Sequence, residues 1–401
     1  MATATIELSG HIIDSMMLPR IFDSIMDLGG SFKVEEFRVG RSADERSFAR
    51  ISIDHAEPVR LEAIVAACQQ QGAMLASTVA ARTEPAPRDG VFPDAFYSTS
   101  NQPTQVRLDG AWIDVEDIEM DCAIVLSDGR ARCVPVTDVR VSDLIVVGHD
   151  GIKVSPVERS RSKEIFGFMT STVSAEKPKH LVIRELAATM REIRERNGRI
   201  CFVGGPAIIH TGAGEHLARI IAGGYVNVLF AGNALPAHDI EAQLFGTSLG
   251  IDLRNGLPIE SGHEHHIRAI NRIRAVGGIV AAVDQGILRG GVMYECVRHH
   301  VDMVLAGSVR DDGPLPDVVT DMVEVQRRMR SALRGVELCI MCATMLHAIA
   351  TGNMLPAATK TVCVDINPAV VTKLADRGSS QTLGLVTDIE SFLRELAECL
   401  P

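Results

Sequence analysis

Several segments of the sequence combine residue types that suit chemistry on a bound small molecule. The first, CFVGGPAIIHTGAGEHLARII at residues 201–221, joins an apolar run, clustered glycines and a helical pattern. Small residues let a backbone approach a pyrophosphate, and the N–H groups at a helix start favour an anion. However, the dinucleotide signature GxGxxG would need glycines at 212, 214 and 217, and residue 217 is leucine. A phosphate or ribose site and a tight strand-to-helix turn are therefore both open interpretations.

The second segment, FAGNALPAHDIEAQLFGTSLG at residues 230–250, places two acids and a histidine just after an apolar run. On a helix His238 and Glu241 share a face, and Asp239 is offset by about a quarter turn. In one interpretation the acids hold a substrate ammonium group while His238 transfers protons. In the other, the segment is a solvated helix start with Asp239 near the N-terminus. Asn233 occupies the strand end at which an acid usually binds a ribose.

The third segment, VLAGSVRDDGPLPDVVTD at residues 304–321, is a charged loop after another apolar run. Its two prolines stiffen the chain and exclude a helix. Arg310 could bind a carboxylate through two hydrogen bonds. Asp311 or Asp312 could act as a base or hold an ammonium group. The alternative is a structural turn held by ion pairs.

The C-terminal segment VCVDINPAVVTKLADRGSSQTLGLVTDIESFL offers a further set of polar residues. Asp365 ends an apolar run, the position at which a ribose hydroxyl is often bound. Thr387 and Asp388 begin the last predicted helix. Lys373 could donate a proton or pair with a carboxylate, although a lone lysine on a helix is also typical of a plain surface position.

Two groups of potential metal ligands occur, and we predict that neither binds a metal. His263, His265 and His266 cluster in GHEHHIRAIN, but no partner ligand stands at a fixed spacing. We expect a turn there, with some of these side chains facing the site. Cys339 and Cys342 form a single CxxC in an apolar run, which is typical of core cysteines.

The elements that must position these residues follow a repeating strand and helix pattern from about residue 179. A helix over 179–198 ends at a glycine, and apolar runs then predict strands at 200–205, 226–233, 278–283, 302–308, 338–343 and 362–367. Strands that are apolar throughout are typical of a parallel sheet buried on both faces. Because ligands bind outside the carboxyl ends of such strands, Asn233, Ser308, Asp365 and Asn367 should gather at one edge.

The first part of the chain has a different pattern. Residues 1–95 alternate strand, helix, strand, strand and helix, which predicts an α+β sandwich, with a proline-rich linker at 81–94. Residues 96–165 form a small β module in which Asp-Gly turns stand at 109–110, 128–129 and 150–151. Residues 166–401 then form the third domain. The fold class is α/β: an α+β domain and a β module, followed by a mostly parallel, doubly wound dinucleotide-binding domain.

Composition narrows the class of partner. The formal net charge is -11 with both signs interspersed, so we expect no nucleic acid. No apolar run approaches the roughly 20 residues that cross a membrane, and no basic segment precedes an apolar block at the start. The nine cysteines stand mostly in apolar runs, which favours reduced thiols in a cytoplasm.

Six strings in order resemble one known family. They are GPAIIHTGAGEH, AGNALPAHDIEAQLFGTSLG, GHEHHIRAIN, LAGSVRDDGPLPDVVTD, LHAIATGNMLPA and VDINPAVVTKLADRGSSQ. Together they are similar to the archaeal-type ornithine cyclodeaminases. That family also forms the C-terminal half of cyanobacterial arginine dihydrolase/ornithine cyclodeaminase fusions, and its N-terminal part carries the lysine-ketoglutarate reductase/saccharopine dehydrogenase conserved region. The resemblance covers nearly the whole chain and is densest from about 165 to 401.

The resemblance implies a tightly held NAD in a dinucleotide domain of the deoxyhypusine-synthase type. It also implies a reaction that converts L-ornithine to L-proline and ammonia. A hydride leaves the α-carbon, the δ-amine attacks that carbon, ammonia departs and the hydride returns, so the cofactor is regenerated in each turnover. A homo-oligomer, either a dimer or a tetramer, is also expected.

Residue roles follow from residue type within the matching strings. For catalysis we expect Asp239, Asp312, His238 and Lys373, without deciding which acid is the base. For the substrate we expect Arg310 on the carboxylate, with Glu241 and Asp311. The residues expected to bind NAD are Pro206, His210, Thr211, Gly212, Ala213, Gly232, Asn233, Gly307, Ser308, Asp365, Ile366, Asn367, Thr387 and Asp388.

Two other functions remain as alternatives. An NAD-dependent dehydrogenase of an amino acid or opine-like secondary amine would use the same cofactor and accumulate NADH. A regulatory protein that senses a nucleotide would bind NAD without turnover, with the N-terminal α+β part as its output.

Overall fold

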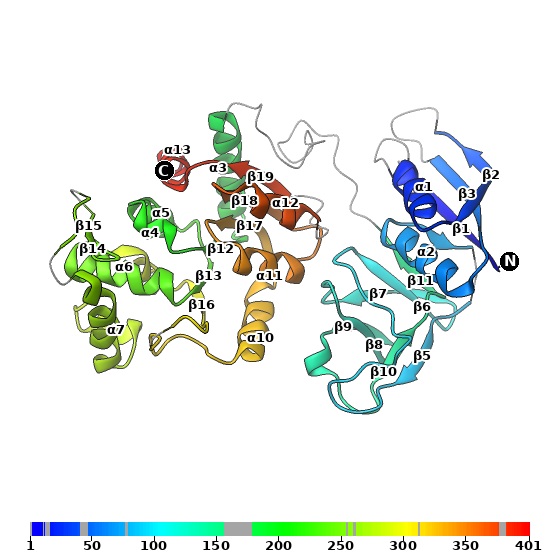
Figure 1. Cartoon of the computed structure of the whole chain (residues 1–401), viewed down its shortest axis with the longest axis horizontal. Helices are drawn as coiled ribbons and strands as arrows, with labels where there is room; N and C mark the ends of the chain where they lie inside the picture. Colours follow the sequence, from blue (N-terminus) through cyan, green and yellow to red (C-terminus); the bar gives the residue numbers. More distant parts are fainter. Residues whose placement is uncertain are drawn as a thin grey trace. The chain divides into compact units, whose positions relative to one another are not determined.

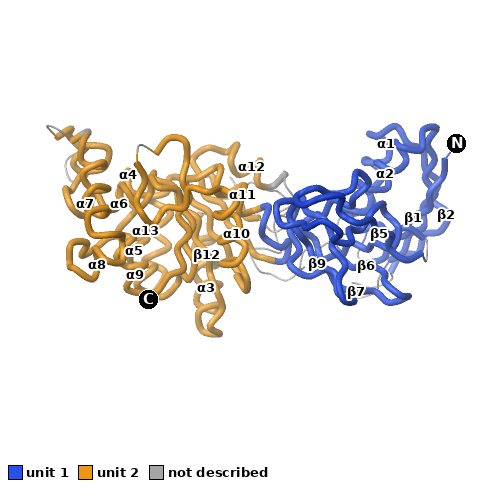
Figure 2. Tube along the Cα trace, turned by 90° about the horizontal axis from the view of Figure 1, so that it is seen from below, with its two compact units in different colours: residues 1–160, 353–358 blue, residues 161–352, 359–401 orange. Residues whose placement is uncertain are grey.

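The computed structural model describes residues 2–10, 12, 17–40, 47–76, 79–155, 179–253, 256–259, 262–311, 313–376 and 382–401. Figure 1 shows its helices and strands in chain order. The chain divides into two compact units, one of residues 1–160 and 353–358 and the other of residues 161–352 and 359–401 (Figure 2). Separate hydrophobic cores lie within the two units.

The first unit begins with the predicted α+β sandwich. Its four-stranded antiparallel sheet has the order β2-β3-β1-β4, formed by Ser31–Arg38, Ser47–His55, Ala2–Gly10 and Met74–Leu75. The alternating burial of β3 turns Ile51 and Ile53 toward α1 (Met17–Asp27) and α2 (Pro58–Gln70). The predicted order of strand, helix, strand, strand and helix is therefore confirmed.

The β module forms one seven-stranded sheet of order β11-β6-β7-β9-β8-β10-β5. In that order the strands are Ile152–Val154, Thr104–Leu108, Ala111–Glu116, Arg130–Val134, Ala123–Ser127, Leu144–Val147 and Arg82–Pro85. A short 3-10 helix, η1, spans Val136–Asp138. Two predicted Asp-Gly turns close hairpins, with positive φ at Asp109, Gly110, Asp128 and Gly129.

The third Asp-Gly pair is also a turn, but the strands that it connects, β10 and β11, lie far apart in the sheet order. One expectation for this region is wrong. The expected linker at 81–94 contains β5, which pairs with β10 at the edge of the sheet. An edge strand tolerates Pro85 because one side of its backbone needs no hydrogen bond. Residues 353–358 also return to this unit, where Asn101 O accepts from Ala357 N at 2.8 Å.

The second unit contains a six-stranded parallel sheet of order β16-β13-β12-β17-β18-β19. Its strands are Asp302–Ala306, Val228–Gly232, Arg199–Gly204, Val336–Cys342, Lys360–Asp365 and Thr382–Val386. Counted along the chain, this order is 3-2-1-4-5-6, the Rossmann order. The order reverses between β12 and β17, and ligands of such sheets bind at that reversal. The predicted fold class is confirmed.

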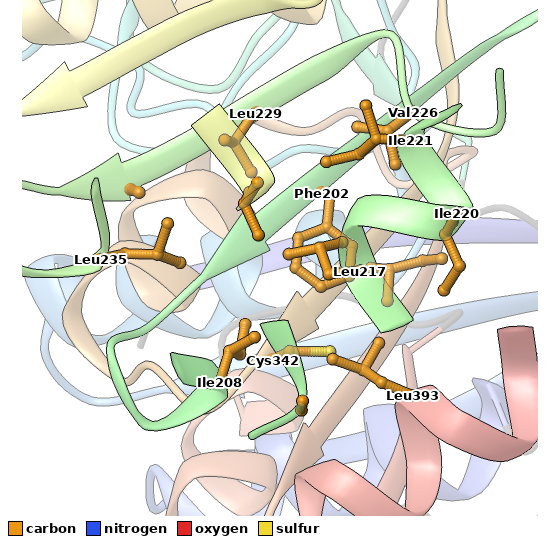
Figure 3. Packing of buried hydrophobic residues seen from close by; sticks show 14 of the residues in the cluster. Phe202, Ile208, Leu217, Ile220, Ile221, Val226, Leu229, Leu235, Cys342 and Leu393 are labelled. Atoms are coloured by element: carbon orange, nitrogen blue, oxygen red, sulfur yellow. The ribbon is translucent and has the colours of Figure 1, made fainter. Parts of the chain in front are cut away.

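Helices cover both faces of this sheet. On one face, α3 (Lys179–Glu195), α5 (Gly214–Ala222), α6 (Ala234–Phe245), α9 (Gly291–Arg298) and α13 (Ile389–Cys399) bury apolar side chains. Figure 3 shows Phe202 of β12 among Leu217 and Ile220 of α5 and Leu393 of α13. The helices α10 (Met322–Leu333), α11 (Leu346–Met354) and α12 (Pro368–Asp376) lie in sequence between the strands from β16 to β19 (Figure 1).

Further elements complete the unit, and one of them corrects a prediction. They are α4 (Ala207–His210), β14 (Thr247–Ser248), β15 (Ile251–Asp252), η3 (Gly262–Glu264), α7 (His265–Val276) and α8 (Ile279–Asp284). The run 278–283, expected as a strand, is α8. A short apolar run fits a buried helix as well as a strand, so periodicity could not decide. The edge strand β19 was missed, since Gly384 weakens its strand pattern.

Candidate functional site

The strand ends at the reversal of the sheet approach each other closely. Gly205 N, just after β12, donates to Cys342 O of β17 at 3.0 Å. A Cβ at Gly205 would lie 1.9 Å from Ala343 O, so only glycine allows this approach. The glycines singled out in the sequence lie elsewhere, because α4 separates β12 from Gly212. Gly212 has φ 83° and open space around it, so the turn that ends the first strand is Gly204–Gly205 and not the 212–214 loop.

The end of β13 is tied to the loop that follows β16. Asn233 is buried, its Oδ1 accepts from Leu315 N at 3.0 Å, and its N donates to Ala306 O at 3.2 Å. The side-chain amide oxygen expected to face a ribose is therefore used to hold the loop. Beside it, a Cβ at Gly232 would lie 3.2 Å from His347 Cε1. This glycine leaves room for an imidazole from the start of α11.

His347 is a candidate that the sequence analysis missed. It follows β17 by five residues, and burial lowers the pKa of its imidazole. Among the described residues it has no hydrogen-bond partner, so both ring nitrogens are available to a ligand. The signal was present, since polar residues after apolar runs were selected at three other strands and this histidine follows a fourth.

The charged loop, defined here as residues 307–313, is held by short-range hydrogen bonds. Ser308 N donates to Asp311 Oδ2 at 2.7 Å, and Arg310 N donates to Ser308 Oγ at 3.1 Å. Arg310 is exposed, and its guanidinium has no partner within the described part of the chain. Asp312 lies outside the described residues. The loop therefore presents an unpaired cation next to a half-buried acid at the end of β16.

The ends of β18 and β19 carry polar residues that cap turns and helices. Asp365 Oδ1 accepts from Asn367 N at 2.8 Å, and Thr387 N donates to Asp365 O at 3.2 Å. Asp388 Oδ1 accepts from Ser391 N at 2.9 Å and caps α13. The neighbouring Ile366 is 74% exposed.

The other predicted residues lie on or beside three helices of the second unit. Lys373 is exposed on α12, and no described side chain contacts its ammonium group. Pro206 and Thr211 flank α4, while Ala213 is buried at the start of α5.

Four histidines gather around α6 from three elements. We define the histidine cluster as His210, His238, His265 and His266 with Glu241, Thr247 and Ser248. The ring of His238 lies 4.7 Å from that of His210 on α4 and 6.3 Å from that of His266 on α7. His210 Nδ1 lies 2.7 Å from Ser248 Oγ. Burial first, and then His238, lowers the pKa of His210.

Glu241 is the centre of this cluster, and its carboxylate is hydrogen-bonded within the protein. Its side chain is fully buried, and its carboxylate accepts from His238 Nδ1 at 2.8 Å, Thr247 Oγ1 at 2.9 Å, Gly250 N at 3.2 Å and Leu249 N at 3.3 Å. Burial alone would raise the pKa of Glu241, but these donors outweigh it and the pKa is lowered. These four hydrogen bonds use both oxygens of Glu241 within the protein, and its expected role in substrate binding stays a prediction.

Asp239 faces a different partner, although it belongs to the same helix. It is 2% exposed, and its two oxygens accept from Val292 N at 2.9 Å and Met293 N at 2.8 Å. These amides open α9, where a carboxylate is favoured by the helix dipole. Burial raises its pKa to about 6. Both oxygens of this acid therefore bind backbone amides at the start of α9, and its expected catalytic role stays a prediction.

The remaining candidates for metal binding are placed as follows. His265 Nδ1 lies 2.8 Å from Thr247 Oγ1, and its ring stacks on Phe245 at 4.7 Å. The His263 side chain is not described. Cys339 and Cys342 are fully buried in β17. Within the described residues, no group of three or more His, Cys, Asp or Glu side chains could hold a metal ion. No helix in the same part of the chain is long and apolar enough to cross a membrane.

The second unit is thus a Rossmann-fold domain, with an acid, a free cation and the free imidazole of His347 close to the carboxyl edge of its sheet. Comparisons with known proteins agree with this class. The family described as arginine dihydrolase ArgZ-like, C-terminal, Rossmann fold matches residues 184–396, and its first region matches 103–183. The LOR/SDH bifunctional enzyme conserved region matches residues 3–102.

Whole-chain relatives make the assignment more specific. The ornithine cyclodeaminase of Methanopyrus kandleri is 54% identical over 98% of this chain and 96% of its own length. The bifunctional arginine dihydrolase/ornithine cyclodeaminase AgrE of Nostoc is 43% identical over 98% of this chain and 58% of its own. The chain therefore belongs to the archaeal-type ornithine cyclodeaminase family.

Solved structures show the same relationship. A LOR/SDH protein from Methanococcus maripaludis has a TM-score of 0.76 and 48% identity, over 80% of this chain and 98% of its own. The ternary complex of AgrE with ornithine and NAD+ has a TM-score of 0.55 and 41% identity, over 100% of this chain and 57% of its own. The deoxyhypusine-synthase-type variant of the fold, expected from the sequence, stays a prediction.

Proposed function

We propose that this chain converts L-ornithine to L-proline and ammonia with an NAD that stays bound. The support is family membership, with about half of the residues identical to archaeal proteins named ornithine cyclodeaminase. The AgrE complex, which holds ornithine and NAD+ together, supports the substrate and the cofactor. In this chain, the observation that carries the proposal is the Rossmann order of the sheet with unpaired polar groups at its carboxyl edge.

The residues at that edge fit a dinucleotide. Asp365 has one oxygen without a partner among the described residues, which suits a ribose hydroxyl. Gly232 and Gly307 leave the ends of β13 and β16 without side chains, and His347 offers two free ring nitrogens. NAD, when bound there, would accept a hydride from the substrate carbon that bears the α-amino group and would return it.

The charged loop suits an amino acid. The guanidinium of Arg310 is free to bind the substrate carboxylate through two hydrogen bonds. Asp311 uses only Oδ2 in the loop, which leaves Oδ1 for an ammonium group. A cation and an acid at adjacent positions match the two charges of an amino-acid substrate. We therefore propose that this loop binds ornithine.

The test is an assay of the full chain with L-ornithine and no added NAD. We expect proline and ammonia in equal amounts, no accumulation of NADH, and NAD released when the protein is denatured. NADH that accumulates with a 2-oxo acid would instead indicate an amino-acid dehydrogenase. Bound NAD with no product from either ornithine or lysine would overturn the proposal. Lysine is included because one methylene changes binding by only about 1–3 kcal/mol.

A further inference from the structure

The hydrogen bonds of the histidine cluster fix which nitrogen of His238 carries a proton. Glu241 is ionised, because its pKa is lowered, and a carboxylate can only accept. Its Oε2 lies 2.8 Å from His238 Nδ1, so the proton of the neutral ring is on Nδ1. Nε2 then carries a lone pair, and it has no partner among the described residues. His238 is thus held as a proton acceptor.

A second route reaches the other oxygen of the same carboxylate. Thr247 Oγ1 donates to Glu241 Oε1 at 2.9 Å, which uses its only proton. The same hydroxyl lies 2.8 Å from His265 Nδ1, so that nitrogen must be the donor. The order of donation is therefore from His265 to Thr247 to Glu241. Thr247 and Glu241 are fully buried, which keeps water from competing for these bonds.

The surroundings of His238 are set by three other elements. His210 faces it from α4 at 4.7 Å, and His266 faces it from α7 at 6.3 Å between ring centroids. Glu241 is the acid of its own helix that faces the ring, since Asp239 is turned to α9. Only 11% of the His238 side chain is exposed. The His238 ring can therefore accept a proton on Nε2 while the buried carboxylate of Glu241 balances the charge.

We propose that His238 carries the proton in the cyclisation, and that Glu241, Thr247 and His265 are positioning residues for it. The inference rests on the proposed function. His238 Nε2 takes a proton from the δ-ammonium group, which frees the electron pair that attacks the α-carbon. Glu241 stabilises the imidazolium that results. The imidazolium passes this proton to the α-amino nitrogen and takes the second proton of the new ring nitrogen, whose electron pair then breaks the C–N bond and releases ammonia. After the hydride returns, His238 gives that proton to the secondary amine of proline, so its ring is neutral again for the next turnover.

The first experiment removes the acceptor nitrogen. His238→Gln should lower kcat at least about 100-fold, as expected for loss of a general base. If the ring only transfers a proton, the NAD content of the purified variant and its circular dichroism should match those of the unchanged protein. Turnover within a factor of about three of the unchanged protein would overturn the proposal. If His238→Gln is unfolded or lacks NAD, the proposal is tested by the Glu241 and Thr247 variants described next.

The second experiment tests positioning through the pH dependence of kcat/KM. Glu241→Gln removes the countercharge of the imidazolium, so the acid limb should move to lower pH. Thr247→Val removes a donor from the carboxylate and strengthens that countercharge, so the limb should move to higher pH. Thr247→Ser keeps the hydroxyl and should restore the original profile. A purely structural role would lower the rate without moving the limb, and unmoved limbs in folded, NAD-bound variants would overturn the positioning role.

A spectroscopic readout separates this inference from the proposed function. Nitrogen-15 NMR of the unchanged chain should show the proton of His238 and of His265 on Nδ1, and in Thr247→Val the His265 signal alone should lose that signature. If the unchanged chain makes no proline, the proposed function fails whatever the NMR shows. If it makes proline but His238 carries its proton on Nε2, only the inference fails.

Discussion

The histidine cluster and the charged loop contain similar residue types but are held in opposite ways. In the cluster, buried Glu241 accepts from a side chain on its own helix, from Thr247 and from two backbone amides beyond that helix. In the loop, exposed Ser308 and Arg310 and half-buried Asp311 bond only within three residues of one another. The cluster is part of the packing, whereas the loop leaves its charged groups free.

This difference has a physical cause. A buried charge without donors costs several kcal/mol, so a carboxylate inside the fold must be surrounded by hydrogen bonds. An exposed charge is solvated and screened, and its removal changes stability little. We therefore expect substitutions in the cluster to affect folding first and those in the loop to affect substrate binding first.

The largest effect should come from Glu241→Ala. Its donors would lose a buried acceptor, so the free energy of unfolding should fall by about 3–5 kcal/mol. Urea unfolding at neutral pH measures this loss. The control is Glu215→Ala on α5, where the carboxylate is 78% exposed and the change should stay within about 0.5 kcal/mol. Equal losses in the two variants would contradict the comparison.

Asp239→Ala should come next, because it removes the acceptor of two backbone N–H groups at the start of α9. The expected loss near neutral pH is about 1–3 kcal/mol, the cost of leaving buried donors unpaired. NAD should still be bound, since the carboxylate of Asp239 is hydrogen-bonded to α9. Loss of NAD from a folded Asp239→Ala variant would instead show that Asp239 is needed for cofactor binding.

The stability difference between the unchanged protein and Asp239→Ala should depend on pH in a definite direction. Burial raises the pKa of Asp239 from 3.8 to about 6, so between these values the folded state binds more protons than the unfolded state. Its contribution to stability is therefore full below about pH 4 and is lost as the pH rises through about 6. The difference in the free energy of unfolding between the unchanged protein and Asp239→Ala should become smaller as the pH rises over that interval. Urea unfolding at a series of pH values would show it, and a constant gap would refute the assignment.

A smaller loss of stability is expected at Asn233, which connects the end of β13 to the segment after the charged loop. Asn233→Ala leaves Leu315 N without its acceptor and should cost about 1 kcal/mol. Hydrogen exchange at the Leu315 amide should become faster, while amides of β12 keep their protection. Unchanged exchange at Leu315 would show that the loop is held in another way.

The smallest effect on folding should come from Arg310→Ala. The side chain is exposed and unpaired among the described residues, so the free energy of unfolding should change by less than about 0.5 kcal/mol. The KM for ornithine should nevertheless rise about tenfold or more, because a charged hydrogen bond contributes roughly 1.5–3 kcal/mol. Arg310→Lys, which keeps the charge but not the paired geometry, should lie between. An unchanged KM would remove Arg310 from the substrate site.

Much of the fold could be read from local pattern. Five of the six apolar runs assigned to the parallel sheet are its strands, because burial on both faces makes such a strand apolar throughout. The exception, residues 278–283, is α8, and the missing strand β19 contains a glycine and begins after residues of no clear pattern. Both errors concern short runs, for which helix and strand look alike in sequence.

The candidate site was only partly readable. Residue types after strand ends directed attention to Arg310 and Asp365, whose side chains keep free groups at those ends, and their roles stay predictions. The selection of polar residues after strand ends did not include His347, although it follows β17 by five residues. It also gave Asp239 and Glu241 a shared role on the substrate, although one caps α9 and the other supports His238.

The sequence by itself determined the α/β class, the buried strands and the chemical types available at their ends, because these depend on periodicity and on residues close in the chain. Only the tertiary structure decided what each polar side chain faces. Each residue on a helix points about 100° away from the one before it. Asp239 on α6 therefore meets α9, whereas Glu241, two positions later, meets the loop after α6. Those partners lie as many as 54 positions away in sequence, and no local pattern records them.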